Sequence, residues 1–377
     1  MSKHEANKNF YLLFVASAFS YSSFFIYSSV YAEYFKSIGK AQNVIGLLMG
    51  IILVTTIVVR PVVGRLNDLW GNKANLFIGM AFYSLAPALY IFSDSTYYLM
   101  FVRLAHGLGS SFFYTSALIY ISSLPFEEKR SGMTGIYLTT QNVAIGLAPL
   151  AGIALYKMFY YSYFLALIPL FLNIISVAFI LLLKTNPPAP KELQNSFFKD
   201  FPMVIRSKSL LRAGFTCFLT AASFGTIMSF LFYAKSEVPN PGVFNAAYGV
   251  TAIVIRLFTS RFIDKINKTT LIISSVAVMF FGVIIFAYAN DSLNLIISGL
   301  FVGAGFCLVY PMLNTMVVEG FKKTEQAVAL GVFTIFYDVG YGLGPIALSN
   351  IPDVTMLFIV AGFLAVVSLL PYLLIKT

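Results

Sequence analysis

The chain has 377 residues, of which 59% are hydrophobic and only 11% are charged. Water-soluble domains are about 45–50% apolar and about 25% charged, so this composition cannot supply a surface that faces water. The apolar residues form long continuous runs, and about 20 such residues span a bilayer as a helix. Backbone groups in lipid must hydrogen-bond internally, and these runs do not alternate as barrel strands do. The composition therefore predicts an all-α integral membrane protein.

The net charge of +10 is unevenly distributed, which argues against a nucleic-acid partner. Basic residues collect in the segments on one side of the predicted spans. The loops of the other side carry only Lys36, Lys40, Lys157 and Lys235. Because cytoplasmic loops are enriched in Lys and Arg, the pattern predicts that both termini are cytoplasmic. We expect a multi-pass protein of the cell membrane, with the lipid bilayer as a partner.

Twelve transmembrane helices are predicted, six in each half of the chain. Their residue ranges are 10–34, 43–63, 74–93, 97–122, 131–156, 159–183, 209–233, 242–262, 269–289, 293–318, 327–349 and 354–374. The longest polar stretch, 184–208, is basic and rich in proline, and is expected to be a cytoplasmic linker. The expected domains are thus an N-terminal half, 1–183, and a C-terminal half, 209–377.

The two halves are copies of one another. Adding 196 to a residue number carries Asp68 onto Asp264 and Pro149 onto Pro345, and the offset holds without a gap. Six spans in each copy give both copies the same orientation. The sequence therefore predicts two parallel six-helix repeats related by an axis along the membrane normal.

Two motifs of the first half are similar to those of a known family. Residues 64–73 read GRLNDLWGNK and resemble the loop between helices 2 and 3 of the major facilitator superfamily, with Asn72 where a basic residue is usual. Residues 103–109 read RLAHGLG and resemble that family's helix-4 motif, with His106 in place of a common glutamine. The resemblance extends over the chain and implies a monomeric transporter with the major facilitator fold.

A third motif lies on the fifth predicted span and is repeated on the eleventh. It resembles the helix-5 motif of drug-efflux proton antiporters, although Ala144 and Ala148 stand where that motif has glycines. Small residues let helix backbones approach closely, so the motif is expected to pack helices. The residues concerned are Gly135, Pro149, Gly152, Gly340, Gly344 and Pro345.

Three ionisable residues inside predicted spans are candidates for proton coupling: Asp338, Arg103 and His106. An ionised side chain at mid-bilayer costs about 2.5–3.5 kcal/mol even on the gentlest scale, so a partner or a water-filled cavity must offset it. For Asp338 the alternative is a protonated packing carboxylate. For Arg103 the alternative is snorkelling to the outer headgroups. His106 titrates near neutral pH when unperturbed, or is a hydrogen-bonded packing residue.

Polar side chains at helical spacing on several spans predict a central substrate cavity, because such residues share one face of a helix. For each of them the alternative is a hydrogen bond between helices, which is worth about 0.6 kcal/mol on average. The candidate cavity residues are Ser20, Ser23, Tyr27, Tyr31, Tyr114, Tyr137, Gln141, Asn142, Tyr310, Asn314 and Tyr337.

The repeated charged loop is expected to act as a conformational latch on the cytoplasmic side. Asp68 would accept backbone N–H bonds or face the positive N-terminus of a neighbouring helix, which we expect to be the eleventh. A solvated loop charge is the alternative. The latch candidates are Gly64, Arg65, Asp68, Gly71, Lys73, Arg261 and Asp264.

The sequence lacks a phosphate-binding loop, clustered metal ligands and a nucleophile–base–carboxylate set. We therefore expect no enzyme activity, no cofactor and no metal. The predicted function is secondary active transport of a small-molecule substrate by alternating access. Our preferred interpretation is efflux by proton antiport. Uptake by proton symport, and a receptor or channel-like protein without coupled transport, remain as alternatives.

Overall fold

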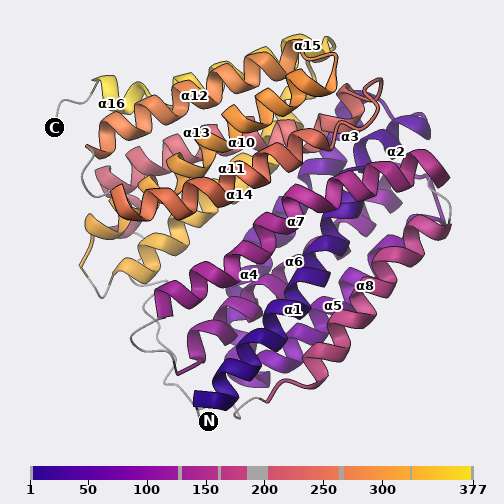
Figure 1. The fold of residues 1–377 in the computed structure, drawn as a ribbon, viewed down its shortest axis with the longest axis vertical. Helices are drawn as coiled ribbons and strands as arrows, with labels where there is room; N and C mark the ends of the chain where they lie inside the picture. Colours follow the sequence, from indigo (N-terminus) through magenta and orange to yellow (C-terminus); the bar gives the residue numbers. More distant parts are fainter. Residues whose placement is uncertain are drawn as a thin grey trace. The chain divides into compact units, whose positions relative to one another are not determined.

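The computed structural model describes residues 3–125, 130–159, 163–184, 203–262, 267–322 and 325–374. All regular secondary structure in these ranges is helical (Figure 1). Each predicted span coincides with one helix or with two consecutive helices. The predicted linker, 184–208, lies largely outside the described residues. The all-helical fold class is therefore confirmed.

The chain divides into two compact units. Unit 1 comprises residues 1–38 and 51–191, and unit 2 comprises residues 39–50 and 192–377. The helices of unit 1 are α1 (Lys3–Ser28), α2 (Tyr31–Ser37), α4 (Ile52–Trp70), α5 (Asn72–Leu89), α6 (Thr96–Ser123), α7 (Arg130–Phe159) and α8 (Tyr163–Leu181). Those of unit 2 are α3 (Gln42–Gly50), α10 (Lys208–Ala234), α11 (Val243–Phe262), α12 (Lys268–Tyr288), α13 (Ser292–Glu319), α14 (Gln326–Leu348), α15 (Val354–Val367) and α16 (Leu370–Leu374).

The packing inside each unit follows the sequence repeat. In unit 1, α1 packs against α7 and α8, α5 packs against α6 and α8, and α4 packs against α6. In unit 2, α10 packs against α14 and α15, α12 packs against α13 and α15, and α11 packs against α13. The 196-residue offset carries each pair of the first set onto a pair of the second. The predicted duplication is thus a duplication of helix packing.

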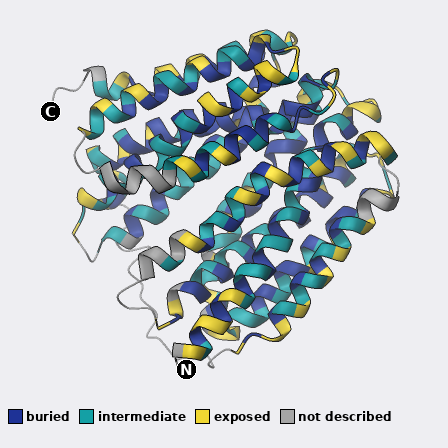
Figure 2. Ribbon diagram, in the orientation of Figure 1, coloured by how far each residue is buried: buried dark blue, intermediate teal, exposed yellow. Residues whose placement is uncertain are grey.

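Eight of the described helical segments are long and apolar enough to cross a membrane. Many large apolar side chains are exposed along the helices. Figure 2 shows the ribbon coloured by burial, with exposed positions recurring along the helices of both units. Helix α8 is an example. On that helix Leu167, Phe171, Ile174 and Leu181 are all more than half exposed. Their spacing places them on one side of the helix. A continuous exposed apolar face of this kind is compatible with lipid rather than water.

The second predicted span is divided between the units at Ile51. Its first part, α3, belongs to unit 2, where Gln42 Nε2 donates to the carbonyl O of Ser349 at 3.2 Å and of Ile351 at 2.6 Å. Gln42 Oε1 accepts from the hydroxyl of Tyr233 at 3.3 Å. One side chain therefore ties α3 to the C-terminal end of α14 and to α10.

The predicted loop between the second and third spans is almost entirely helical. Helix α4 continues to Trp70, and α5 begins at Asn72. Gly71 alone separates them, with φ 81° and ψ 158°. This region of backbone space is essentially accessible to glycine only. The second glycine of the motif is thus the point at which the chain reverses between two helices.

Candidate functional site

The buried charge of unit 1 lies on α6. Arg103 is only 2% exposed, and its guanidinium carbon lies 4.8 Å from the centroid of the Tyr31 ring. His106 is equally buried, and its Nδ1 lies 3.2 Å from the Tyr31 hydroxyl. A desolvated cation–π contact contributes about 2 kcal/mol, which offsets part of the cost of burying the guanidinium. Tyr31 therefore connects both basic residues of α6 to the first span.

Aromatic rings surround this pair of basic residues. The rings of Tyr27 and Tyr31 are stacked with centroids 5.8 Å apart, and the ring of Tyr90, which directly follows α5, lies 4.8 Å from that of Tyr31. The imidazole of His106 contacts Phe24 at 5.0 Å and Tyr83 at 5.6 Å. The helix-4 motif is thus embedded in an aromatic cluster formed by α1, α2 and α5.

Other predicted cavity residues of unit 1 pack between its own helices. The hydroxyl of Tyr137 lies 2.9 Å from Ser17 Oγ and 3.2 Å from the hydroxyl of Tyr21, which joins α7 to α1. Ser20 Oγ donates to Met80 Sδ at 3.5 Å, and Ser23 Oγ donates to the Pro169 carbonyl at 3.2 Å. These four hydrogen bonds stabilise the α1 packing against α5, α7 and α8.

The remaining candidates of unit 1 are partly exposed. Gln141 and Asn142 lie on α7, one turn beyond Tyr137. Tyr114 of α6 is also partly exposed, and the guanidinium carbon of Arg60 lies 5.3 Å from its ring centroid. We did not select Arg60 from the sequence, although it lies inside the predicted span 43–63. A charged residue within a predicted span was the signal that could have found it.

The polar centre of unit 2 lies on α14. Asp338 is the one acidic residue of this helix and is partly exposed. Its neighbour Tyr337 contacts Tyr310 of α13 at 5.2 Å and Tyr341 at 6.0 Å, measured between ring centroids. Tyr310, Tyr337 and Tyr341 are partly exposed as well. The structure thus brings together Tyr310, Tyr337 and Asp338, three residues of unit 2 that the sequence predicted. Asn314, one turn beyond Tyr310 on α13, is partly exposed.

Sequence analysis missed the rings that support this centre. Phe224 of α10 stacks on Phe306 at 4.2 Å and also contacts Tyr248 at 5.1 Å and Tyr341 at 6.2 Å. Cys307 Sγ donates to the Tyr248 hydroxyl at 3.7 Å. Phe306 and Tyr341 each stand four residues from a selected tyrosine. A search for aromatic residues at that spacing could have found both.

The latch candidates are only partly described. The side chains of Asp68 and Arg261 lie outside the described part of the structure, as does residue 264. Arg65 is exposed on α4, and a Cβ added to Gly64 would meet open space. Lys73 Nζ donates to the carbonyl O of Leu181 at 2.7 Å and of Leu183 at 2.9 Å. Lys73 therefore caps the C-terminal end of α8, where a cation is favoured by the helix dipole.

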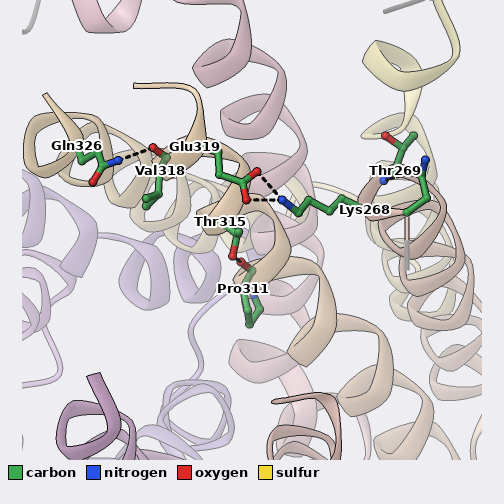
Figure 3. A network of polar contacts seen from close by, with 8 residues as sticks. Lys268, Thr269, Pro311, Thr315, Val318, Glu319 and Gln326 are labelled. Carbon is green, nitrogen blue, oxygen red and sulfur yellow. Dashed lines mark hydrogen bonds and ion pairs between the residues drawn. The ribbon is translucent and has the colours of Figure 1, made fainter. Parts of the chain in front are cut away.

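A different set of contacts joins helix ends in unit 2, as Figure 3 shows. Lys268, at the start of α12, forms an ion pair with Glu319 at the end of α13. Gln326, at the start of α14, donates from Nε2 to the carbonyl O of Val318 at 2.8 Å. Three helices of this unit are therefore tied together at one end.

The predicted packing glycines lie at close helix crossings. A Cβ added to Gly152 would collide with the carbonyl O of Ile26, which places α7 directly on α1. Cβ atoms added to Gly340 and Gly344 would collide with the carbonyls of Phe218 and Ala222 on α10. Pro149 and Pro345 lie inside α7 and α14. The side-chain surroundings of residue 135 are outside the described part.

Within the described ranges, no group of three or more His, Cys, Asp and Glu side chains is placed to hold a metal ion. Tyrosines surround the ionisable groups selected from the sequence, with Tyr31 at Arg103 and His106 in unit 1 and Tyr337 beside Asp338 in unit 2.

The chain is similar to a known protein family, to known transporters and to a solved structure. The family model described as Major Facilitator Superfamily matches residues 13–345 and 242–376. The staphylopine export protein of Staphylococcus aureus (strain Mu50) is 22% identical over 349 residues, which cover 88% of this chain and 87% of that protein. An uncharacterised MFS-type transporter of Methanocaldococcus jannaschii is 20% identical over 389 residues, which cover 98% of each chain. The crystal structure of the nucleoside transporter NupG has a TM-score of 0.81 at 15% identity and covers 98% of this chain and 100% of that chain, which is a likeness of fold.

Proposed function

Since the chain belongs to the Major Facilitator Superfamily, we propose that it exports a small organic solute in exchange for protons, by alternating access. The family makes the protein a multi-pass membrane transporter. The direction of transport, the coupling ion and the class of solute are our proposal.

The observation that carries this proposal is Asp338. It is the one carboxylate of α14, is partly exposed, and lies next to a tyrosine in ring contact with Tyr310 and Tyr341. An ionised carboxylate is costly at this depth, and protonation removes the charge. Such a group is suited to carry a proton across the membrane and to release it where water enters. Asn142, its counterpart in the first half, cannot titrate.

We assign Arg103 and His106 to proton coupling together with Asp338. Both are buried and both contact Tyr31, so any change of charge at one of them acts on the other through a medium of low polarity. Export is the direction we favour because a relative that matches most of this chain is described as a staphylopine exporter.

Proton movement in proteoliposomes tests the proposal. Vesicles with an acidic lumen and a pH dye receive pools of candidate solutes outside, with the membrane potential clamped. An antiporter releases protons as solute enters, so a pool that contains the substrate raises the luminal pH. A symporter lowers the luminal pH further when the substrate is added, and that result would establish uptake instead.

Asp338→Asn is expected to abolish solute-driven proton movement while leaving insertion into the membrane intact. The matched control is Asp353→Asn, the same chemical change at the N-cap of α15. Asparagine also caps helices well, so this control is expected to retain coupling. Coupled flux of wild-type size in Asp338→Asn would remove the proton role of this residue.

The proposal also includes a cytoplasmic latch at the α4–α5 turn and cytoplasmic termini, in a monomer of the cell membrane. Asp68→Asn is expected to slow transport without weakening substrate binding, and unchanged turnover would show that the latch is unnecessary. Single cysteines placed between residues 184 and 208 are expected to react only with membrane-permeant reagents in intact cells. Reaction with an impermeant reagent would reverse the orientation.

A further inference from the structure

Helices α1, α5 and α8 of unit 1 pack together around a buried amide. Asn173, near the middle of α8, is 0% exposed. Among the described residues, neither its amide nitrogen nor its amide oxygen has a hydrogen-bond partner. A buried donor or acceptor that loses its bonds to water and gains none destabilises the folded state. The burial of Asn173 therefore points to a ligand at this junction of helices.

The register of α1 against α8 shows what Asn173 faces. The Ser176 hydroxyl donates to the carbonyl O of Ala16 at 2.8 Å, and the Ser23 hydroxyl donates to the carbonyl O of Pro169 at 3.2 Å. These contacts advance in opposite directions along the two helices, so α1 and α8 run antiparallel. Asn173 lies one helical turn from each of the two contact points on α8. It therefore lies on the face of α8 that packs against α1.

Ser20 holds the matching position on α1, one helical turn from both Ala16 and Ser23. It is 0% exposed, and its hydroxyl donates to Met80 Sδ of α5 at 3.5 Å. A thioether sulfur is a weak acceptor, so this bond satisfies the hydroxyl poorly. The register thus places the amide of Asn173 opposite a hydroxyl that can form a stronger hydrogen bond.

The chemistry of the amide limits what can bind there. Asn173 presents a donor, Nδ2, and an acceptor, Oδ1. A cation would leave the donor unpaired, and an anion would leave the acceptor unpaired. A water molecule both donates and accepts, and buried waters make about three hydrogen bonds to groups that are otherwise unsatisfied. Water is therefore the ligand that matches this side chain.

The second copy of the repeat fills the equivalent place differently. The offset of 196 carries Asn173 onto Leu369 and Ser176 onto Tyr372. A leucine side chain needs no hydrogen-bond partner, and a tyrosine side chain occupies far more volume than that of serine. The pair of small polar side chains is thus a feature of unit 1, where the junction has both the polarity and the room that a water molecule needs.

We propose that Asn173 and Ser20 bind an internal water molecule that bridges α8 to α1 in the core of unit 1. The water accepts from Asn173 Nδ2 and donates its two hydrogens to Asn173 Oδ1 and Ser20 Oγ. Helix α1 continues to Tyr27, whose ring stacks on Tyr31 beside Arg103. The bridge therefore holds the helix that supports the basic residues of α6. It is independent of the proposed direction and coupling of transport.

Radiolytic footprinting of the purified full chain in detergent tests the site. X-ray pulses convert water into hydroxyl radicals, which oxidise the side chains that they meet first. Met80 is 1% exposed, so a water molecule beside Asn173 should make it oxidise to the sulfoxide under X-rays, although hydrogen peroxide in the bulk solvent should not reach it. Mass spectrometry measures the product. An unoxidised Met80 after the X-ray pulse would overturn the proposal, as would oxidation by peroxide as fast as that of the exposed Met158.

Asn173→Leu locates the water, because it removes the amide at nearly constant size. It is expected to lower the X-ray oxidation of Met80 about tenfold, since the water loses its main partner. The matched control is Asn9→Leu, the same change in the same helix pair. The amide of Asn9 is paired through both atoms with the backbone of Lys184, at 2.9 and 3.3 Å. This control should keep the wild-type oxidation of Met80. Equal oxidation in Asn173→Leu and wild type would overturn the site.

The melting temperatures of the same two variants give a second test that does not depend on Met80. Asn9→Leu should melt at a lower temperature than wild type, because the backbone of Lys184 loses its partners. Asn173→Leu should melt close to wild type, because the amide and its water are removed together. A clear rise in the melting temperature of Asn173→Leu would show that the amide is unpaired in the wild-type protein, and the proposal would fail.

Discussion

The polar centres of the two units differ in how they are held, although the units are copies of one another. In unit 1 the polar side chains at the centre, such as Tyr137 and His106, are fully buried and hydrogen-bonded. In unit 2 the polar side chains at the centre, Tyr337, Asp338 and Tyr341, are partly exposed. Gln141 and Asn142, the counterparts of Tyr337 and Asp338 in unit 1, are also partly exposed but carry no charge. Burial with partners is typical of a structural network, and partial exposure around a charge is typical of a site that exchanges a ligand or a proton.

The repeat itself shows where the copies diverged. The offset of 196 places Asn142 opposite Asp338, and Tyr137 opposite Phe333. It also places Arg103 opposite Gly299, where a Cβ would collide with the carbonyl O of Phe244. The position that holds a cation in unit 1 thus serves close helix packing in unit 2. The two copies therefore keep the same helix packing, and they differ in which single positions carry a charged side chain.

The largest effect that we expect concerns the α10–α14 crossing of unit 2. Gly340→Ala should destabilise the protein by about 3 kcal/mol or more, because the added methyl group meets a backbone carbonyl that cannot move alone. Unfolding in mixed SDS micelles measures this. Gly362→Ala on α15 is the control, since its nearest atoms lie at an ordinary 3.4 Å. Equal stability of the two variants would show that α14 does not pack directly on α10.

The turn between the second and third spans offers a direct comparison of the copies. Gly71→Ala should cost about 1–3 kcal/mol, because φ 81° with ψ 158° is strained for alanine. The same assay measures it. The corresponding residue in unit 2, Asn267, has ordinary backbone angles and caps α12 through its side chain. Asn267→Gly should therefore cost only a few tenths of a kcal/mol. A greater loss at Asn267 than at Gly71 would contradict this assignment.

The contrast between buried and exposed tyrosines predicts a separation of effects. Tyr137→Phe should lower the free energy of unfolding by about 1–2 kcal/mol, because Ser17 and Tyr21 lose a partner in a buried site. Tyr337→Phe keeps the ring contacts and should leave stability within about 0.5 kcal/mol of wild type. The transport rate should fall more in Tyr337→Phe than in Tyr137→Phe. If Tyr337→Phe were the less stable variant, the two centres would not differ in the way described.

The smallest expected effect is at the α3 contact inside unit 2. Gln42→Leu should reduce stability by about 1 kcal/mol, because the hydrogen bonds to Ser349, Ile351 and Tyr233 are partly exposed. Hydrogen exchange at the end of α14 measures the change locally. Unchanged protection there would show that Gln42 does not hold this helix end.

The amino-acid sequence by itself determined the fold class, the spans and the duplication. Apolar runs of bilayer length leave the backbone no alternative to helix, and a constant offset of 196 relates residues one to one. These properties depend on composition and on spacing along the chain, and both can be read directly from the sequence. The sequence also indicated which ionisable residues stand inside spans, because charge in an apolar run is conspicuous.

Only the tertiary structure decided which polar residues meet. Helical spacing placed Ser20 and Tyr31 on one stripe, yet Ser20 contacts Met80 of α5 whereas Tyr31 contacts His106 of α6. The break between α1 and α2 at Ser29 and Val30, the helical course of residues 64–70 and the division of the second span at Ile51 also had no sequence signal that we used. Side-chain partners are set by helices distant in sequence, and the packing of those helices is a property of the folded chain alone.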